Sequence, residues 1–128
     1  MAPQSRKDSV KILVVEDNPD LMRIMRLQLR VMGYETLAAS TGLQAVEVAV
    51  QQVPDLITMD ITLPDMDGLE AARRIREHPA TRAVPILAVT ARSLPEHRQR
   101  CINGGCNDYI SKPFTASILA ERIETLLA

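Results

Sequence analysis

The sequence predicts an α/β fold: a doubly wound sheet of five parallel strands, covered on both faces by five helices. The first observation is that strand and helix signals alternate five times along the chain without a long gap. The second is that the runs at 55–60 and 85–90 are almost continuously apolar, as expected for interior strands of a parallel sheet. Right-handed crossovers between such strands then favour helices on both faces.

Each strand is predicted from a short apolar run that ends at a polar residue or turn. The run that begins at Glu35, ETLAAS, is less hydrophobic than the others. A weak strand of this kind suits the edge of a sheet, where one side carries no partner. The five predicted strands lie near 11–16, 35–39, 55–60, 85–90 and 108–111.

The helices are predicted from their capping residues. Asn18 is a favoured N-cap, Pro19 suits the first helical turn, and Gly33 suits the residue that follows the last turn. The same reasoning places the other four helices from about Thr41 to Gln52, from near Gly68 to before Pro79, from near Pro95 to Gly104-Gly105, and from Thr115 to the C-terminus.

Composition indicates one domain and limits the classes of function. The chain has 128 residues, of which 46% are hydrophobic, so a single core accounts for 10–128, while the polar residues 1–9 are predicted to form a flexible tail. Aromatic residues make up only 2%, which argues against a stacking surface for nucleotide bases. The net charge of −1 gives no reason to expect nucleic acid or membrane binding.

Targeting and cysteine signals point to an ordinary cytosolic protein. The N-terminal segment lacks the apolar core of a signal peptide, and no apolar stretch is long enough to span a bilayer. Cytoplasmic localisation is therefore predicted. Cys101 and Cys106 lack the spacing of a zinc site, and the absence of a secretion signal argues against a structural disulfide. We expect two buried or half-buried thiols.

Five polar residues mark the predicted functional site, because each stands at or just after the carboxyl end of a predicted strand. In an open parallel sheet these ends line one edge, where ligands bind. The acidic pair could simply cap a helix, and Lys112 could simply pair with Asp60. Three carboxylates beside a hydroxyl and an amine nevertheless suit a divalent cation and a phosphoryl group, since like charges so close are costly without a cation. The residues are Glu16, Asp17, Asp60, Thr90 and Lys112.

Four segments make the chain resemble the receiver domains of bacterial response regulators, a CheY-like superfamily. They are VVEDN (14–18), MDITLPDMDG (59–68), VTA (89–91) and SKPF (111–114). The segments GYETL (33–37) and GGCNDYISKP (104–113) make it resemble particularly the stand-alone, DivK-type members. The resemblance covers nearly all of the chain from about Lys11. It implies a flavodoxin-like sheet with strand order 2-1-3-4-5, and a Lys112–Pro113 bond that is often cis.

The resemblance also implies a role for each matched residue. Asp60 would accept a phosphoryl group from the phosphohistidine of a histidine kinase or phosphotransfer protein. Mg²⁺, with Mn²⁺ as an alternative ion, would be held by Asp17, Asp60 and the backbone carbonyl of Thr62, with Glu16 acting largely through water. Lys112 and the Thr90 hydroxyl would contact the phosphoryl oxygens. Thr90 and Tyr109 would form the switch that alters the surface offered to a downstream protein target.

Three other functions fit the sequence less well. A haloacid-dehalogenase-type phosphatase would require an Asp at the position of Thr62. A flavin-binding protein would require a phosphate-binding loop at the position of the segment EDNPD (16–20). A degenerate receiver used only for binding would not need the full set of acidic, Thr and Lys residues. We therefore expect a phosphoacceptor signalling domain rather than an enzyme. Two sources remain open: a single-domain response regulator, or a receiver excised from a hybrid histidine kinase.

The first helix predicts a partner surface. On a helical wheel, one face should pack on the sheet: Leu21, Ile24, Met25, Leu29 and Met32. Arg23, Arg26 and Arg30 fall on the opposite, solvated side, and Met22 and Leu27 flank the two. Met22 is assigned to a docking patch for a phosphohistidine-bearing helical bundle. Tyr109 is assigned to the alternative surface, formed by the fourth helix, fifth strand and fifth helix.

Overall fold

The computed structural model describes residues 10–91 and 95–128, and for 95–97 it describes the backbone only. The predicted tail at 1–9 lies outside these residues. Strands and helices alternate in this order: β1 (Lys11–Val15), α2 (Pro19–Val31), β2 (Glu35–Ala39), α3 (Gly42–Gln52), β3 (Leu56–Asp60), α4 (Gly68–Glu77), β4 (Ile86–Thr90), α5 (Pro95–Asn103), β5 (Asp108–Ser111) and α6 (Ala116–Leu127).

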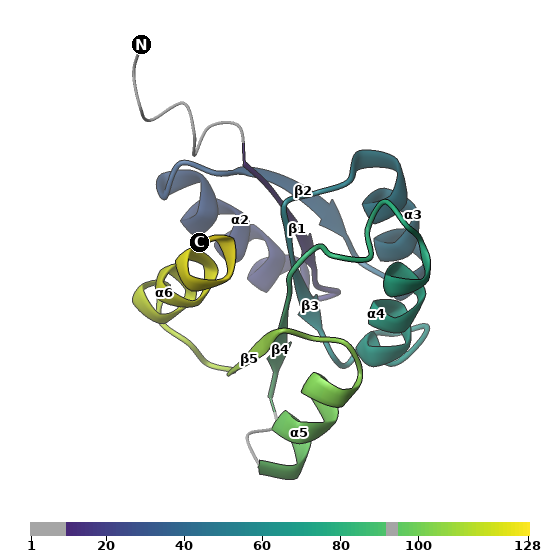
Figure 1. Cartoon of the computed structure of the whole chain (residues 1–128). Helices are drawn as coiled ribbons and strands as arrows, with labels where there is room; N and C mark the ends of the chain where they lie inside the picture. Colours follow the sequence, from purple (N-terminus) through teal and green to yellow (C-terminus); the bar gives the residue numbers. More distant parts are fainter. Residues whose placement is uncertain (1–9, 92–94) are drawn as a thin grey trace.

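The five strands form one parallel sheet in the order β2-β1-β3-β4-β5, which confirms the predicted fold class and strand order. Helices α2 and α6 cover one face, and α3, α4 and α5 cover the other (Figure 1). β3 and β4 are buried at every position, whereas β2 lies at an edge and is buried only at Ala39. The weaker apolar run is thus the edge strand.

The two faces of the sheet bury separate apolar clusters because successive strand side chains point in opposite directions. Leu13, Ile57 and Met59 pack beneath α3 and α4. Ile12, Leu56 and Leu87 pack beneath α2 and α6. Small residues let the helices on the first face approach the sheet closely, and all of them are fully buried: Ala45, Ala49, Ala71 and Ala72.

Helices α2 and α6 begin at their predicted N-caps, Asn18 and Thr115. The Asn18 side chain accepts hydrogen bonds from the backbone N–H groups of Asp20 and Leu21 at 2.9 and 3.1 Å. Gly33 follows α2 with a φ of 101°, a left-handed conformation that favours glycine. Among the described residues, no helix is both long and apolar enough to cross a membrane.

The prediction for the buried face of α2 is wrong at Ile24. Met25 and Leu29 are buried, but 51% of Ile24 is exposed. Ile24 lines an open cleft with Leu21 and Phe114, because the segment that follows β5 does not close over this side of the helix. Arg26, which was predicted to be solvated, is partly buried, and its Nε donates a hydrogen bond to Thr36 Oγ1 at 3.0 Å.

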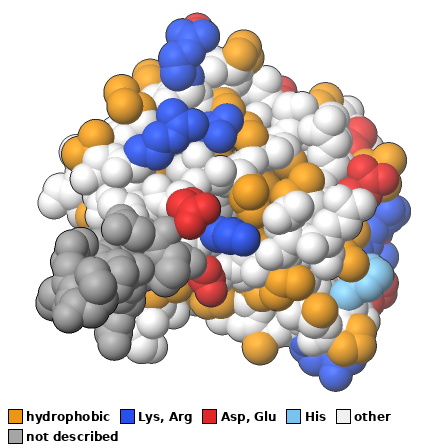
Figure 2. All heavy atoms as spheres, turned by 90° about the horizontal axis from the view of Figure 1, so that it is seen from above, with side chains coloured by type: hydrophobic (Ala, Val, Ile, Leu, Met, Phe, Trp, Pro, Cys, Tyr) orange, Lys and Arg blue, Asp and Glu red, His pale blue; other side chains and the backbone are white. Residues whose placement is uncertain are grey.

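The described residues at the amino ends of the strands present a mixed surface. Figure 2 shows this face, where charged groups of both signs and small apolar groups are interspersed. Near this end of the sheet, the Asp55 carboxylate accepts the backbone N–H of Lys11 at 2.8 Å. The concentrated acidic group lies at the opposite edge.

Gly68 should be intolerant of any side chain. A Cβ at this position would lie 2.2 Å from the backbone carbonyl oxygen of Asp60. Gly68→Ala should therefore lower the free energy of unfolding by about 1–3 kcal/mol, as overpacking does, measured by urea denaturation. Gly42→Ala is the matched control, because its new Cβ would meet the flexible Met66 side chain instead of backbone. An equal loss in both variants would contradict the close approach at Gly68.

Candidate functional site

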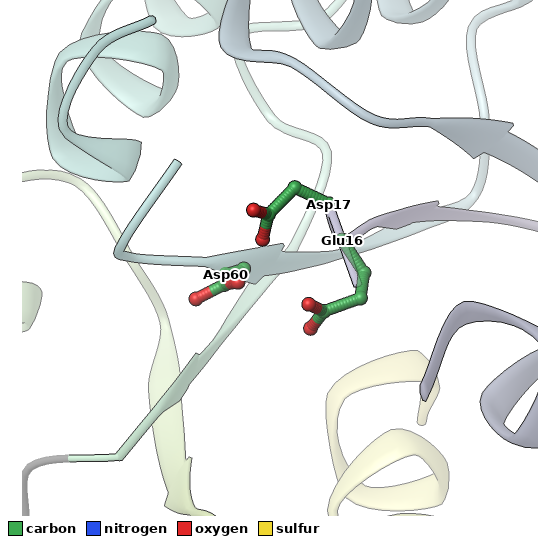
Figure 3. A group of neighbouring side chains, drawn as sticks. All are labelled: Glu16, Asp17 and Asp60. Carbon is green, nitrogen blue, oxygen red and sulfur yellow. The ribbon is translucent and has the colours of Figure 1, made fainter. Parts of the chain in front are cut away.

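Three carboxylates converge at the carboxyl edge of the sheet (Figure 3). Glu16 and Asp17 follow β1, Asp60 ends β3, and one carboxylate oxygen of each lies within 4.8 Å of the others. Glu16 and Asp60 are only 2% and 4% exposed, whereas Asp17 faces solvent. Adjacent parallel strands bring these residues together because Val15 pairs with Met59, one residue before each site.

Lys112 supplies the positive charge of the site. Its Nζ lies 3.0 Å from Glu16 Oε1 and 3.4 Å from Asp60 Oδ2, so the closer partner is Glu16 rather than the predicted Asp60. The Lys112 backbone N–H donates to the Thr90 carbonyl at 2.7 Å, which continues the pairing of β4 with β5. The Lys112–Pro113 peptide bond is cis.

The charges of this group do not balance when all three carboxylates are ionised. One ammonium faces three carboxylates, which leaves two negative charges in excess. The other Glu16 oxygen accepts the Asn18 backbone N–H at 3.0 Å, so both Glu16 oxygens already have donors. Among the described residues, no hydrogen bond to the Asp17 side chain is found. A divalent cation fits this donor set because it prefers oxygen ligands and neutralises the excess charge.

The pKa of Asp60 reflects the same imbalance. Burial, with a smaller contribution from the nearby Glu16 carboxylate, raises the pKa of this carboxyl to about 6. The backbone N–H of Thr62, 3.0 Å from Asp60 Oδ1, and the Lys112 ammonium act in the opposite direction. The ionised form of Asp60 is therefore under-stabilised by the protein alone, and a cation beside it would lower its pKa.

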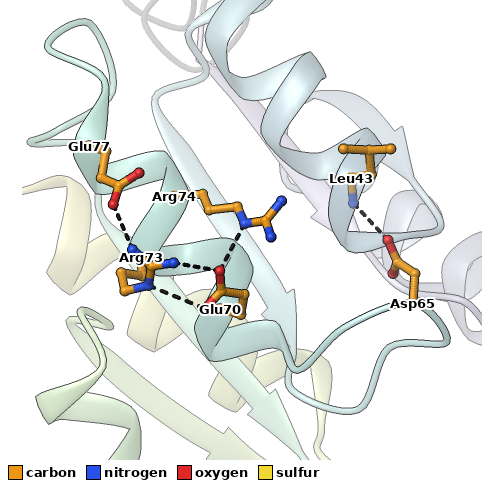
Figure 4. A network of polar contacts seen from close by, with 6 residues as sticks. All are labelled: Leu43, Asp65, Glu70, Arg73, Arg74 and Glu77. Atoms are coloured by element: carbon orange, nitrogen blue, oxygen red, sulfur yellow. Dashed lines mark hydrogen bonds and ion pairs between the residues drawn. The ribbon is translucent and has the colours of Figure 1, made fainter.

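The loop that follows Asp60 is held by contacts that sequence reasoning missed. Asp65 accepts the backbone N–H groups of Gly42 and Leu43 at 2.7 and 3.0 Å, which ties the loop to the start of α3 (Figure 4). Asp67 caps α4 through Leu69 and pairs with Arg100 of α5 at 2.8 Å. The Asp65 contacts and the Asp67–Arg100 pair join residues far apart in the sequence, so no local pattern predicts them, whereas the Asp67 cap is a local contact.

Figure 4 also shows an ion-pair network on the solvent side of α4. Glu70 contacts Arg73 at 2.5 Å and Arg74 at 2.9 Å, and Arg73 contacts Glu77 at 2.6 Å. The two arginines hold the pKa of Glu70 down at about 2. These side chains are substantially exposed, and ion pairs of this kind contribute little to stability. We assign the network to the helix surface rather than to the site.

The two predicted switch residues lie on adjacent strands but not opposite each other. Tyr109 pairs in register with Ala88, and Thr90 pairs with Ser111. Thr90 is 4% exposed and lines a cavity of about 200 Å³ beside the site, together with Thr62 and Cys101. Tyr109 is half-buried against the apolar cluster beneath α3 and α4. Movement of either residue stays a prediction.

The predicted partner residue on α2 is less accessible than its neighbours. Met22 is half-buried against the core, and it lines a shallow hollow with Glu16 and Asp17. The more exposed apolar side chains of this helix are Ile24, Leu27 and Val31, at 51%, 59% and 81%. Ile24 borders a cleft of about 480 Å³ whose lining includes Lys112. Apolar surface therefore adjoins the site on both sides of the helix.

Comparisons with known proteins agree on one family. Residues 12–124 match the response regulator receiver domain. The chain is 38% identical over 116 residues to the polar-differentiation response regulator DivK of Brucella ovis, and the alignment covers 91% of this chain and 94% of DivK. DivK of Brucella anthropi is 38% identical over the same length.

Solved structures give the same result. The receiver domain of a sensor histidine kinase from Pseudomonas aeruginosa PAO1, solved with a magnesium ion coordinated in its active-site cleft, is 40% identical with a TM-score of 0.86. That comparison covers 92% of this chain and 97% of the other. A response regulator from Chloroflexus aurantiacus is 33% identical with a TM-score of 0.88 over the same shares. The fold, the strand-end acidic group and these matches together show that the chain belongs to the response regulator receiver domain family of two-component systems.

Proposed function

We propose that Asp60 accepts a phosphoryl group from the phosphohistidine of a histidine kinase or a histidine phosphotransfer protein. The observation that carries this proposal is the site's charge: among the described residues, a buried Asp60 stands beside two other carboxylates and one ammonium. A divalent cation would offset the excess negative charge and the further negative charge that a phosphoryl group brings. The chain acts as a phosphoacceptor signalling domain that assists its own phosphorylation, rather than as an enzyme with a separate substrate.

The proposed reaction moves one phosphoryl group between two residues. An Asp60 carboxylate oxygen attacks the phosphorus, an O–P bond forms, and the N–P bond of the phosphohistidine breaks as its electron pair returns to the imidazole. Transfer of this kind depends on in-line positioning and on stabilising charge at the phosphoryl oxygens. Lys112 can turn from its carboxylate partners toward those oxygens, and the Thr90 hydroxyl at the end of β4 is the second candidate contact.

Mg²⁺ is the proposed cofactor. Asp17 and Asp60 would hold it directly, with the Thr62 backbone carbonyl as a further ligand, and Glu16 would act through water because Lys112 and Asn18 already occupy its oxygens. Bound there, the ion would neutralise charge on the transferred group. The magnesium-bound receiver from Pseudomonas aeruginosa supports this choice, and no comparison supports Mn²⁺ in its place.

We further propose that the chain works as a single-domain response regulator in the cytoplasm. Its match to DivK covers 94% of that protein, which favours this role over a receiver excised from a hybrid histidine kinase. The output would then be a change in the surface offered to a downstream protein target.

The acceptor is tested by Asp60→Asn. Incubation with Mg²⁺ and acetyl phosphate should add one alkali-labile phosphoryl group to the wild type, detected by intact mass, and none to the variant, since an amide is a poor nucleophile. Asp65→Asn is the matched control, because Asp65 lies in the same loop but faces α3, and it should still be labelled. Undiminished labelling of Asp60→Asn would remove Asp60 from this role.

The partner surface is best tested at Ile24, which is exposed and adjoins the Lys112 cleft. Ile24→Glu should slow transfer from a phosphohistidine donor roughly tenfold, since about 1.4 kcal/mol of lost contact has that effect, and should spare labelling by acetyl phosphate. Met22→Glu should act in the same direction, but its half-buried position adds a cost in stability.

Val31→Glu is the control for this test, because Val31 is the more exposed apolar residue at the far end of the same helix. Equal slowing at Ile24 and Val31 would indicate a general effect of charge on α2. Normal transfer in Ile24→Glu and Met22→Glu would move the partner to α5, β5 and α6, the surface that includes Tyr109.

The switch is tested by NMR with beryllofluoride as the phosphoryl mimic. We expect large shift changes at Thr90 and Tyr109, because a local charge event at Asp60 should bias a two-state element on β4 and β5. Thr90→Ala should bind the mimic but leave Tyr109 unchanged. Shift changes confined to the immediate neighbours of Asp60 in the wild type would count against the switch.

A further inference from the structure

The end of α5 places two cysteines against each other. The backbone N–H of Cys106 donates to the Cys101 carbonyl at 3.0 Å, Gly105 donates to the Ile102 carbonyl at 3.2 Å, and Gly105 has a φ of 106°. This is a Schellman motif, in which the residues joined by the outer hydrogen bond commonly pack their side chains together. Cys101 and Cys106 are that pair, and both lie in the same apolar cluster as free thiols.

Arg76 fixes this turn from the α4 side. Its Nε and Nη2 both donate to the Gly105 carbonyl, at 3.1 and 2.9 Å, and Nη2 also donates to Asn107 Oδ1 at 2.8 Å. The Gly105 backbone before Cys106 and the Asn107 side chain after it are therefore held in place. A disulfide requires the two Cα atoms to lie close together, and the direct backbone hydrogen bond from Cys106 to Cys101 brings the two residues near each other.

A cavity gives small molecules a route to one of the two thiols. Cys101 is only 3% exposed in total, and it lines the cavity of about 200 Å³ beside Thr90. The Asp67–Arg100 ion pair belongs to the same lining. This volume is much larger than the roughly 10–15 Å³ that one water molecule needs, so it admits hydrogen peroxide. Cys106 is buried and does not line the cavity.

We propose that Cys101 and Cys106 form a reversible thiol–disulfide site at the end of α5, with Cys101 as the residue that a peroxide reaches first. The Cys101 sulfur attacks one peroxide oxygen, the O–O bond breaks, and a sulfenic acid and one water result. The Cys106 sulfur then attacks the sulfenic sulfur, an S–S bond forms, and a second water leaves. Two thiols lose two electrons and the peroxide gains them. A dithiol reductant reverses the bond by exchange.

The disulfide would join the last turn of α5 to the residue two before β5. Burial raises the pKa of the Cys106 thiol to about 12 and raises that of Cys101 as well. Both thiols therefore stay protonated at neutral pH, and the thiolate is the reactive form. The reaction is accordingly slow and requires peroxide in excess. This site does not depend on the proposed phosphoryl transfer.

The test is oxidation of the reduced, folded full chain with excess hydrogen peroxide, followed by intact mass and peptide mapping. We expect a product lighter by two hydrogen atoms, an internal Cys101–Cys106 link, and full recovery with dithiothreitol. Cys106→Ala should instead gain one oxygen at Cys101, trapped by dimedone. Asp60→Asn should oxidise like the wild type, which separates this result from the proposed function.

Three results would overturn the proposal. Both thiols could remain open to alkylation once the peroxide-treated protein is denatured. The products could be disulfide-linked dimers or over-oxidised thiols without the internal link. The link could form only at urea concentrations that unfold the chain, as judged by circular dichroism, which would mean that the folded protein does not offer the pair to oxidant.

Discussion

The structure depends on an unequal set of charges at the carboxyl edge of the sheet. Glu16 and Asp60 are buried there beside Asp17, and among the described residues Lys112 is the ammonium that contacts them. Burying a charge is costly unless it is paired. The fold carries this cost at one edge of the sheet, where β1 and the neighbouring β3 end and where Lys112 follows β5 on the far side of β4. A cation bound there would offset the cost.

The rest of the molecule holds this edge in position. β3 and β4 are buried at every position, so the strands that present Asp60 and Thr90 are packed on both faces. The loop after Asp60 is attached to α3 through Asp65, to α5 through Asp67, and to the Asp60 backbone through the tight approach of Gly68. A change at the phosphoacceptor therefore has direct physical links to helices on the same face of the sheet.

Much of the fold could be predicted from the sequence, because its signals are local. The apolar runs predicted the bounds of the strands to within one residue. The side chains of Asn18, Thr41 and Thr115 cap the helices that follow them. The prediction failed for Ile24, whose burial depends on whether another segment covers that side of α2. The closer contact of Lys112 with Glu16 and the hydrogen bonds of Asp65 could not be predicted either, because they depend on the positions of side chains from distant parts of the sequence.

The central claim is that the acidic group is destabilising alone and is completed by a divalent cation. The most direct measurement is the free energy of unfolding of the wild type, Asp17→Asn and the control Asp20→Asn, with and without Mg²⁺. Without metal, Asp17→Asn should be more stable than the wild type, because like-charge repulsion is relieved. At a hundredfold excess over its dissociation constant, Mg²⁺ should stabilise the wild type and Asp20→Asn by about 2.7 kcal/mol and Asp17→Asn by much less. Equal effects of Mg²⁺ on all three proteins, with no gain for metal-free Asp17→Asn, would contradict the account.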